Sequence, residues 1–223
     1  MRYTIRLGMT QSYLLPGDAG YLLIDAGPRG RADAFFRALR RYGIDPGQIR
    51  LIIVTHAHFD HVGSLHAIRQ RCACPVMIHE AEAGLLSRGQ VVLPPGTNPL
   101  TRRLIRLANR HPRLIKRWFR FDPVRPDHVI NGPLDLAPYG FNARILPTPG
   151  HTPGSLTVVT PAGLAFVGDL AINTLPAGLG PYWPPFGDDP DLIRAGWRTL
   201  REMGVTTLYP AHGRPFKAEK LPL

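Results

Sequence analysis

The chain has 223 residues, of which 44% are hydrophobic, and its 27 Lys and Arg against 16 Asp and Glu give a formal net charge of +11. This length suits one domain, residues 1–223, with a sizeable buried core, and the composition is typical of a globular protein. No apolar run reaches the roughly 18 residues of a membrane-spanning helix, and the first residues lack the apolar stretch of a secretory signal. These features predict a cytoplasmic protein without a transmembrane segment.

Hydrophobic periodicity predicts a mixture of strands and helices along the chain. In chain order, the expected elements are strands at 3–7, 12–15 and 21–24, a helix at 33–42, a strand at 51–54, a helix at 63–71, a strand at 76–78, a helical segment at 100–120 broken at Pro112, a strand pair at 129–136 and 141–146, a second pair at 156–160 and 164–167, a helix at 191–203 and a strand at 206–209. Loops rich in Pro and Gly at 91–99 and 176–187 are expected either to shape a pocket or to be plain surface connections, and Cys72 and Cys74 are expected to be buried free thiols.

Three imidazoles and a carboxylate stand directly after the apolar run 51–54, in the segment Thr-His-Ala-His-Phe-Asp-His at 55–61. His56 and His58 would point the same way on extended backbone, and Asp60 and His61 follow on the turn into the next helix. Imidazole nitrogen and carboxylate oxygen suit zinc, iron, manganese or nickel. The segment therefore predicts a metal site where a buried strand ends.

Three later segments supply further ligands of the same kinds. His151 lies in a stiff Pro/Gly turn after the strand at 141–146, Asp169 ends the strand at 164–167, and His212 comes just past the strand at 206–209. A rigid sheet can aim loop side chains that lie at its strand ends. The complete predicted ligand set, enough for two metal ions, is His56, His58, Asp60, His61, His151, Asp169 and His212.

The His-x-His-x-Asp-His run, followed by a separated His, Asp and His, resembles the metallo-β-lactamase-fold hydrolase superfamily, in particular its glyoxalase II-like and lactonase-like members. The resemblance implies an α/β fold, a four-layer αβ/βα sandwich built from two similar halves with the site at one edge. It also implies two divalent metal ions, zinc first and iron or manganese as alternatives. In this scheme His56, His58 and His151 hold the first metal, Asp60, His61 and His212 hold the second, and Asp169 bridges both.

Asp25 also ends a strand, within Leu23-Ile24-Asp25-Ala26-Gly27, and matches a recurrent motif of the superfamily. It is expected to hydrogen-bond the metal loop and orient a ligand, with a structural turn aspartate as the alternative.

The resemblance implies a dinuclear hydrolase in which a hydroxide bridging the two metals attacks an ester, a thioester or a lactone. Asp60 is expected to be a ligand and also to exchange a proton with the nucleophile or the leaving group. Acyl-homoserine lactonases carry a tyrosine three positions after the bridging aspartate, and Ile172 at that position counts against their activity. Two alternatives stay open. One is a phosphodiesterase or nuclease acting on an anionic substrate, which the charge favours; the other is a mononuclear iron sulfur oxygenase, against which the full second ligand set argues.

A basic helical insertion is predicted at about 98–128, between the two halves of the chain. Between Thr101 and His128 the sequence carries nine Arg and Lys against Asp122 and Asp127, interleaved with apolar residues at helical spacing. We expect this insertion to be a lid over a small-molecule substrate, with Trp118 and Phe119 facing that substrate. The alternatives are a nucleic-acid surface, a peripheral contact with an anionic membrane, or a solvated basic face over ordinary core. The sequence carries no signal for an oligomeric state.

Overall fold

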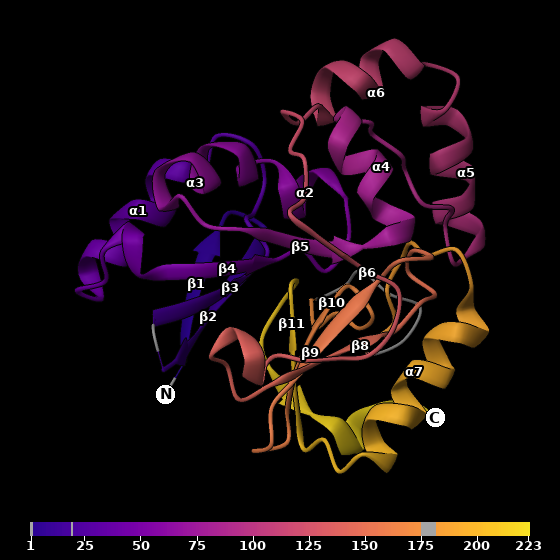
Figure 1. Cartoon of the computed structure of the whole chain (residues 1–223). Coiled ribbons are helices and arrows are strands. Elements are labelled where there is room, and N and C mark those ends of the chain that lie inside the picture. Colours follow the sequence, from indigo (N-terminus) through magenta and orange to yellow (C-terminus); the bar gives the residue numbers. More distant parts are fainter. Residues whose placement is uncertain (1, 19, 175–181) are drawn as a thin grey trace.

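Two six-stranded sheets form the centre of the molecule in the computed structural model, which describes residues 2–18, 20–174 and 182–223 (Figure 1). The first sheet has the order β1 (Tyr3–Leu7), β2 (Thr10–Gly17), β3 (Gly20–Ile24), β4 (Ile49–Ile53), β5 (Val76–His79) and β6 (His128–Ile130). The second has the order β12 (Phe216–Lys217), β11 (Thr207–Pro210), β10 (Leu164–Gly168), β9 (Leu156–Val159), β8 (Arg144–Pro147) and β7 (Leu134–Asp135).

Each sheet contains parallel strands whose carboxyl ends meet at one edge. In the first sheet β3, β4, β5 and β6 run parallel, whereas β1, β2 and β3 are paired antiparallel. In the second sheet β10 and β11 are parallel neighbours, and the other pairs are antiparallel. Loops that follow parallel strands are therefore gathered at one edge of each sheet.

Seven α-helices surround these sheets in the part of the chain that the structure describes. They are α1 (Ala32–Arg41), α2 (Phe59–Val62), α3 (Leu65–Cys72), α4 (Glu80–Arg88), α5 (Pro99–Ala108), α6 (Pro112–Phe119) and α7 (Pro190–Glu202). Three short 3-10 turns add to them, η1 (Pro46–Gln48), η2 (Ala137–Tyr139) and η3 (Ala218–Lys220). Figure 1 shows α1 and α3 on the outer side of the first sheet, α7 on the opposite side of the molecule, and α4, α5 and α6 together at one end.

Three apolar cores separate four layers, and side-chain alternation along the strands explains them. On β4, Ile52 faces the core shared with α1 and α3, whereas Leu51 and Ile53 face the second sheet. On β10, Phe166 faces the first sheet, and Ala165 packs in the core that α7 covers. Strands buried on both faces are nearly continuously apolar, as the sequence of both strands shows. The predicted four-layer αβ/βα sandwich is confirmed.

Most predicted elements are present, but one strand prediction is wrong. The expected strand at 129–136 is two strands in different sheets: β6 pairs with β5, and β7 pairs with β8. The chain crosses between the sheets at Gly132 and Pro133, and proline has no backbone N–H to continue a ladder.

Helix α4 was not predicted. The predicted break near Pro112 is present, since α5 ends at Ala108 and Pro112 begins α6.

Cys72 and Cys74 are buried free thiols, as predicted. Among the described residues, no helix combines the length and the apolar character needed to span a membrane.

Candidate metal centre

The loop between β4 and α2 is buried and carries four of the predicted ligands. His56 and His58 follow β4, and His58 lies on extended backbone directly before the first residue of α2. Asp60 and His61 lie on α2 itself, and all four residues are at most 8% exposed. Burial of so many polar groups is costly unless they have partners, so the loop is built around a shared polar centre.

The second sheet supplies the other three predicted ligands from the loops after β8, β10 and β11. These are His151, Asp169 and His212. The two halves meet closely at Gly168, which has φ +52° and directly precedes Asp169. A Cβ atom at Gly168 would lie 2.7 Å from Thr55 Oγ1, a separation that real side chains do not adopt. Only glycine lets Asp169 approach the first loop in this way.

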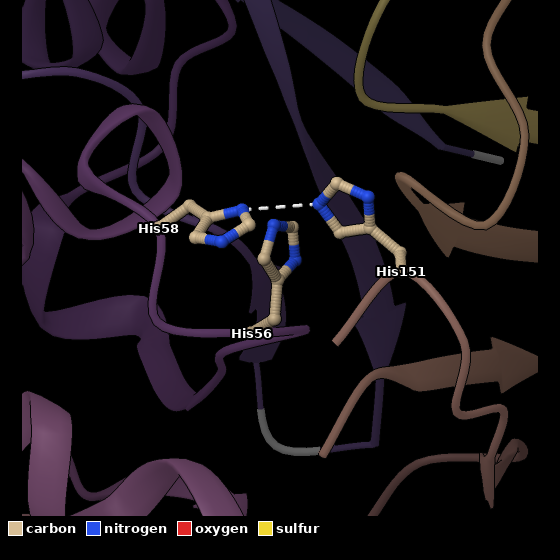
Figure 2. A group of neighbouring side chains, drawn as sticks. All are labelled: His56, His58 and His151. Carbon is tan, nitrogen blue, oxygen red and sulfur yellow. Dashed lines mark hydrogen bonds between the residues drawn. The ribbon is translucent and has the colours of Figure 1, made fainter. Parts of the chain in front are cut away.

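All seven predicted ligands come together in three overlapping groups. Each residue offers one ligand atom, and within a group these atoms lie within 4.8 Å of one another. The groups are His56, His58 and His151; His56, His61 and Asp169; and Asp60, His61 and His212. Figure 2 shows the imidazoles of the first group converging, with His58 Nδ1 3.0 Å from His151 Nε2.

Asp169 lies between the two outer groups. Its Oδ1 atom is 3.3 Å from His61 Nε2, and its Oδ2 atom is 3.4 Å from His212 Nε2 and 3.6 Å from His151 Nε2. Asp60 Oδ2 lies 3.2 Å from His212 Nε2. Asp169 is thus close to imidazoles of both outer groups.

The two ends of the site differ in their electrostatics. Burial, followed by the repulsion of His151, lowers the pKa of His58 to about 3, and burial also lowers the pKa values of His56 and His151. Burial opposes the charged form of His212 as well, but Asp169 and Asp60 outweigh it and raise the pKa of His212 to about 10. The first three imidazoles are thus neutral, with lone pairs free for a metal.

The carboxylates of the site are held ionised. Burial alone would raise the pKa values of Asp60 and Asp169, but His212 and His61 outweigh it and lower both. The site therefore combines neutral nitrogen donors at one end with anionic oxygen donors at the other.

Three buried atoms in the centre of this cluster make no well-formed hydrogen bond among the described residues: His56 Nε2, and the pair His61 Nε2 and Asp169 Oδ1, which face each other at 3.3 Å. A buried polar atom without a partner is costly and calls for an explanation. Their residues form one of the three ligand groups, and metal ions bound by these residues would satisfy the three atoms. The residues present fit divalent metal ions.

Asp25 lies where the prediction expected hydrogen bonds to the metal loop. Its carboxylate accepts hydrogen bonds from His61 Nδ1 at 2.8 Å, from the Thr55 backbone N–H at 2.8 Å and from the Thr55 hydroxyl at 2.8 Å. Asp25 is also one of few non-glycine residues with positive φ, at 59°, a conformation that is strained for most residues. The bond to Nδ1 leaves His61 Nε2 facing the ligand cluster.

Backbone carbonyls hold two more imidazoles in the same way. His151 Nδ1 lies 2.9 Å from the Phe186 carbonyl, and His212 Nδ1 lies 3.0 Å from the Met9 carbonyl. An Nδ1–H that donates to a carbonyl fixes the ring and leaves Nε2 as the free ligand atom.

Sequence reasoning missed Glu82 of α4, which joins the two ligand loops. This carboxylate is 2% exposed, and it accepts hydrogen bonds from the Ala57 N–H at 3.0 Å and from the Gly154 N–H at 3.2 Å. Ala57 stands between His56 and His58, and Gly154 follows His151. Glu82 lies 21 residues beyond His61 in a helix that was not predicted, so no local signal marked it.

A cavity of about 570 Å³ adjoins the metal ligands and has a largely apolar wall. The wall is formed by Met9, Phe59, Val92, Leu93, Pro94, Leu104, Ile105, Ala108, Ile115, Phe119, Ile172, Thr174, Pro184, Pro185 and Phe186, and the floor by His58, Asp60, His151, Asp169 and His212. Both predicted pocket loops contribute, although residues 176–181 lie outside the described residues. No Lys or Arg is found among the described residues that line this cavity.

The basic insertion borders this cavity, but its two predicted lid residues differ. Phe119 is part of the wall, and its ring packs on Phe59 with centroids 4.3 Å apart. Trp118 is 77% exposed and is not part of the wall. The structure thus brings Phe119 to the cavity and leaves Trp118 outside it.

The layered fold and this ligand cluster define a class of metal-dependent hydrolases. The sequence pattern of the metallo-beta-lactamase superfamily matches residues 5–212, and the chain belongs to that superfamily.

Relatives agree with this assignment. A probable metallo-hydrolase of Methanocaldococcus jannaschii, MJ0888, is 31% identical over 92% of this chain and 87% of its own length. The chicken acyl-coenzyme A thioesterase MBLAC2 is 27% identical over 77% of this chain and 59% of its own length. Among solved structures, the B3 metallo-beta-lactamase BLEG-1 superposes with a TM-score of 0.69, at 25% identity over 99% of this chain and 95% of that one.

Proposed function

We propose that this chain is a dinuclear metal-dependent hydrolase of an ester, thioester or lactone that carries an apolar acyl group. One observation carries the choice of substrate: the cavity that ends on the ligand cluster is walled by aliphatic and aromatic side chains. Pockets of this size and composition bind apolar parts of small molecules, while a few polar groups orient the reacting bond.

His56, His58 and His151 would hold one metal ion, Asp60, His61 and His212 the other, and Asp169 both. The convergence of the seven side chains supports two sites rather than the single site of a mononuclear oxygenase. When bound, two such ions would lower the pKa of a water to make it a nucleophile and would polarise the substrate carbonyl.

The chain's own groups would position the substrate and move the proton. The cavity wall would exclude water around the acyl group and direct the carbonyl to the floor, where Asp60 and Asp169 lie. Asp60 lies on the cavity floor, where it would accept a proton from the attacking water and pass it to the leaving group. Phe119 and the α5–α6 segment would close the apolar end as a lid.

Two observations favour carbonyl substrates over phosphodiesters. The described cavity wall holds no Lys or Arg to receive a phosphodiester, and the cations of the insertion lie on exposed positions. Among relatives, MBLAC2 is named as an acyl-coenzyme A thioesterase, which supports the thioester in particular.

A substrate panel tests the proposal. The enzyme reconstituted with zinc, iron or manganese would be assayed on p-nitrophenyl esters and acyl-coenzyme A thioesters of increasing chain length, an acyl lactone, a β-lactam and a phosphodiester. We expect kcat/KM to rise with acyl length until the cavity is filled. A phosphodiester preferred over every ester and thioester would overturn the proposal.

A further inference from the structure

The outer surface of α5 and α6 is unusually apolar for an exposed surface. Of the twelve large apolar side chains that are exposed in the described part of the chain, five lie on these two helices: Leu100, Leu104, Leu107, Leu114 and Trp118. Leu100 and Trp118 are 78% and 77% exposed. Concentrations of exposed apolar side chains mark surfaces that contact another apolar phase.

The same two helices carry a dense positive charge. Residues 99–120 contain eight cationic side chains and no acidic one, and no Asp or Glu occurs anywhere from 83 to 121. The cations are Arg102, Arg103, Arg106, Arg110, Arg113, Lys116, Arg117 and Arg120, all of them exposed. No acidic side chain of the segment is present to neutralise them.

The apolar residues of the helices are divided between two directions. Ile105, Ala108, Ile115 and Phe119 are half-buried and line the cavity. Leu100, Leu107, Leu114 and Trp118 do not line it. On each helix the exposed residues recur at helical spacing, as Leu100, Leu104 and Leu107 on α5 and as Leu114 and Trp118 on α6. The proposed lid accounts for the residues that line the cavity. It gives no function to the exposed residues that do not line it.

We propose that the α5–α6 surface, meaning the exposed side chains of residues 99–120, docks on an anionic phospholipid bilayer. Leucine and tryptophan would enter the interfacial region, and the arginines would contact lipid phosphates. Leucines supply no base stacking and no base-edge hydrogen bonds, so the pattern suits a bilayer better than a nucleic acid. This inference rests on the surface alone and does not depend on the proposed substrate.

Docking in this orientation would place the cavity next to the membrane. Leu104 is both 55% exposed and part of the cavity wall, so the surface and the cavity meet at α5. An amphiphilic substrate would then reach the ligand cluster from the bilayer surface.

Vesicle sedimentation of the metal-loaded full chain tests the proposal. We expect binding to vesicles of phosphatidylcholine mixed with phosphatidylglycerol, weaker binding to phosphatidylcholine alone, and a loss of binding as salt rises. Each cation near an anionic surface contributes roughly a fivefold factor in binding. Arg113→Gln with Arg117→Gln should therefore weaken binding by more than about tenfold.

Matched variants separate this surface from a general effect of charge or of hydrophobicity. Arg37→Gln with Arg41→Gln makes the same charge change on α1, which Figure 1 shows far from α6, and should leave binding unchanged. Leu107→Ser with Trp118→Ser should also weaken binding, whereas Leu192→Ser on α7, where the leucine is 44% exposed, should not. Circular dichroism and thermal unfolding would confirm that every variant is folded.

Tryptophan fluorescence gives a second readout. Trp197 is buried and Trp183 half-buried, so Trp118 should report insertion by a blue shift on mixed vesicles that Trp118→Phe abolishes.

Four results would overturn the proposal. The first two are failure of the wild type to bind mixed vesicles, and equal losses in the control and test variants. The third is tight oligonucleotide binding without vesicle binding. The fourth is self-association that Leu107→Ser with Trp118→Ser abolishes, again without vesicle binding.

Discussion

The ligand loops and the α5–α6 segment border the same cavity but are held in place very differently. The ligand loops are buried, and other polar groups hold them in place: Asp25 bonds His61, Glu82 bonds two backbone amides, and carbonyls bond His151 and His212. Neither α5 nor α6 has a fully buried residue, and the segment meets the cavity mainly through half-buried apolar side chains.

This difference suggests that the ligand loops and the α5–α6 segment have different roles in one site. Buried hydrogen-bond networks fix geometry closely, and metal ligands need that precision. Segments with few buried contacts open and adapt more readily, and binding loops and lids are commonly of this kind. Changes in the ligand loops should therefore affect metal content and rate together, whereas changes in the cavity-lining side chains of α5–α6 should affect substrate affinity and leave the metal content unchanged.

The largest effect is expected from Asp169→Asn. A neutral amide shared by two cations cannot offset their mutual repulsion, so both metal content and kcat should fall, the latter by more than about a hundredfold. Elemental analysis and steady-state kinetics would measure both, with Asp122→Asn, an exposed aspartate, as the control. A variant that keeps its full metal content and near-normal turnover would refute the assignment of Asp169.

Asp25→Asn should come next. Loss of the carboxylate removes the charge-assisted bond that orients His61, and such partners typically change metal affinity by about 10- to 100-fold. Competition with a chelator would measure metal affinity, and Asp33→Asn on the exposed face of α1 is the control. Unchanged chelator sensitivity with reduced thermal stability would instead make Asp25 a structural turn residue.

Glu82→Gln should have a smaller but broader effect. The amide can still accept from one backbone N–H but presents an NH₂ group to the other, so roughly 1–3 kcal/mol of unfolding free energy should be lost. Metal should also dissociate faster, since the loops of His56, His58 and His151 lose their link. Glu80→Gln, at an exposed position on the same helix, controls for the loss of charge. An effect on stability with no change in metal dissociation would mean that Glu82 does not act on the site.

The smallest effect is expected from Phe119→Ala. KM for long-chain esters should rise several-fold while kcat for short esters and the metal content stay unchanged, because only the apolar wall is altered. Trp118→Ala is the matched comparison, since it removes an aromatic side chain one position away but outside the wall. Equal effects of the two variants on KM would contradict the division between wall and outer surface.

The ligand set could be predicted from the sequence because its members follow apolar strands directly. Each of His56, Asp169 and His212 stands within three residues of the end of a strand, and parallel strands bring such positions to one edge. The four-layer fold could be predicted through the resemblance to the superfamily, because the motifs that carry this resemblance lie at the same strand ends.

Other features depend on tertiary packing that no local pattern records. Glu82 matters only because α4 lies across two loops that are distant in the sequence. The strand predicted at 129–136 is split between two sheets, and alternation gives the face of a strand but not its sheet. Helical periodicity likewise predicts an amphipathic α6 but does not say whether Trp118 or its neighbour Phe119 faces the cavity.

Metal content measured together with activity is the sharpest test of a dinuclear site in this chain. The chain would be stripped with a chelator, titrated with zinc, iron or manganese, and examined by elemental analysis and ester or thioester hydrolysis at each step. We expect saturation at two metal ions per chain, with full activity reached only at the second. Saturation at one ion per chain, or full activity with one bound, would contradict it.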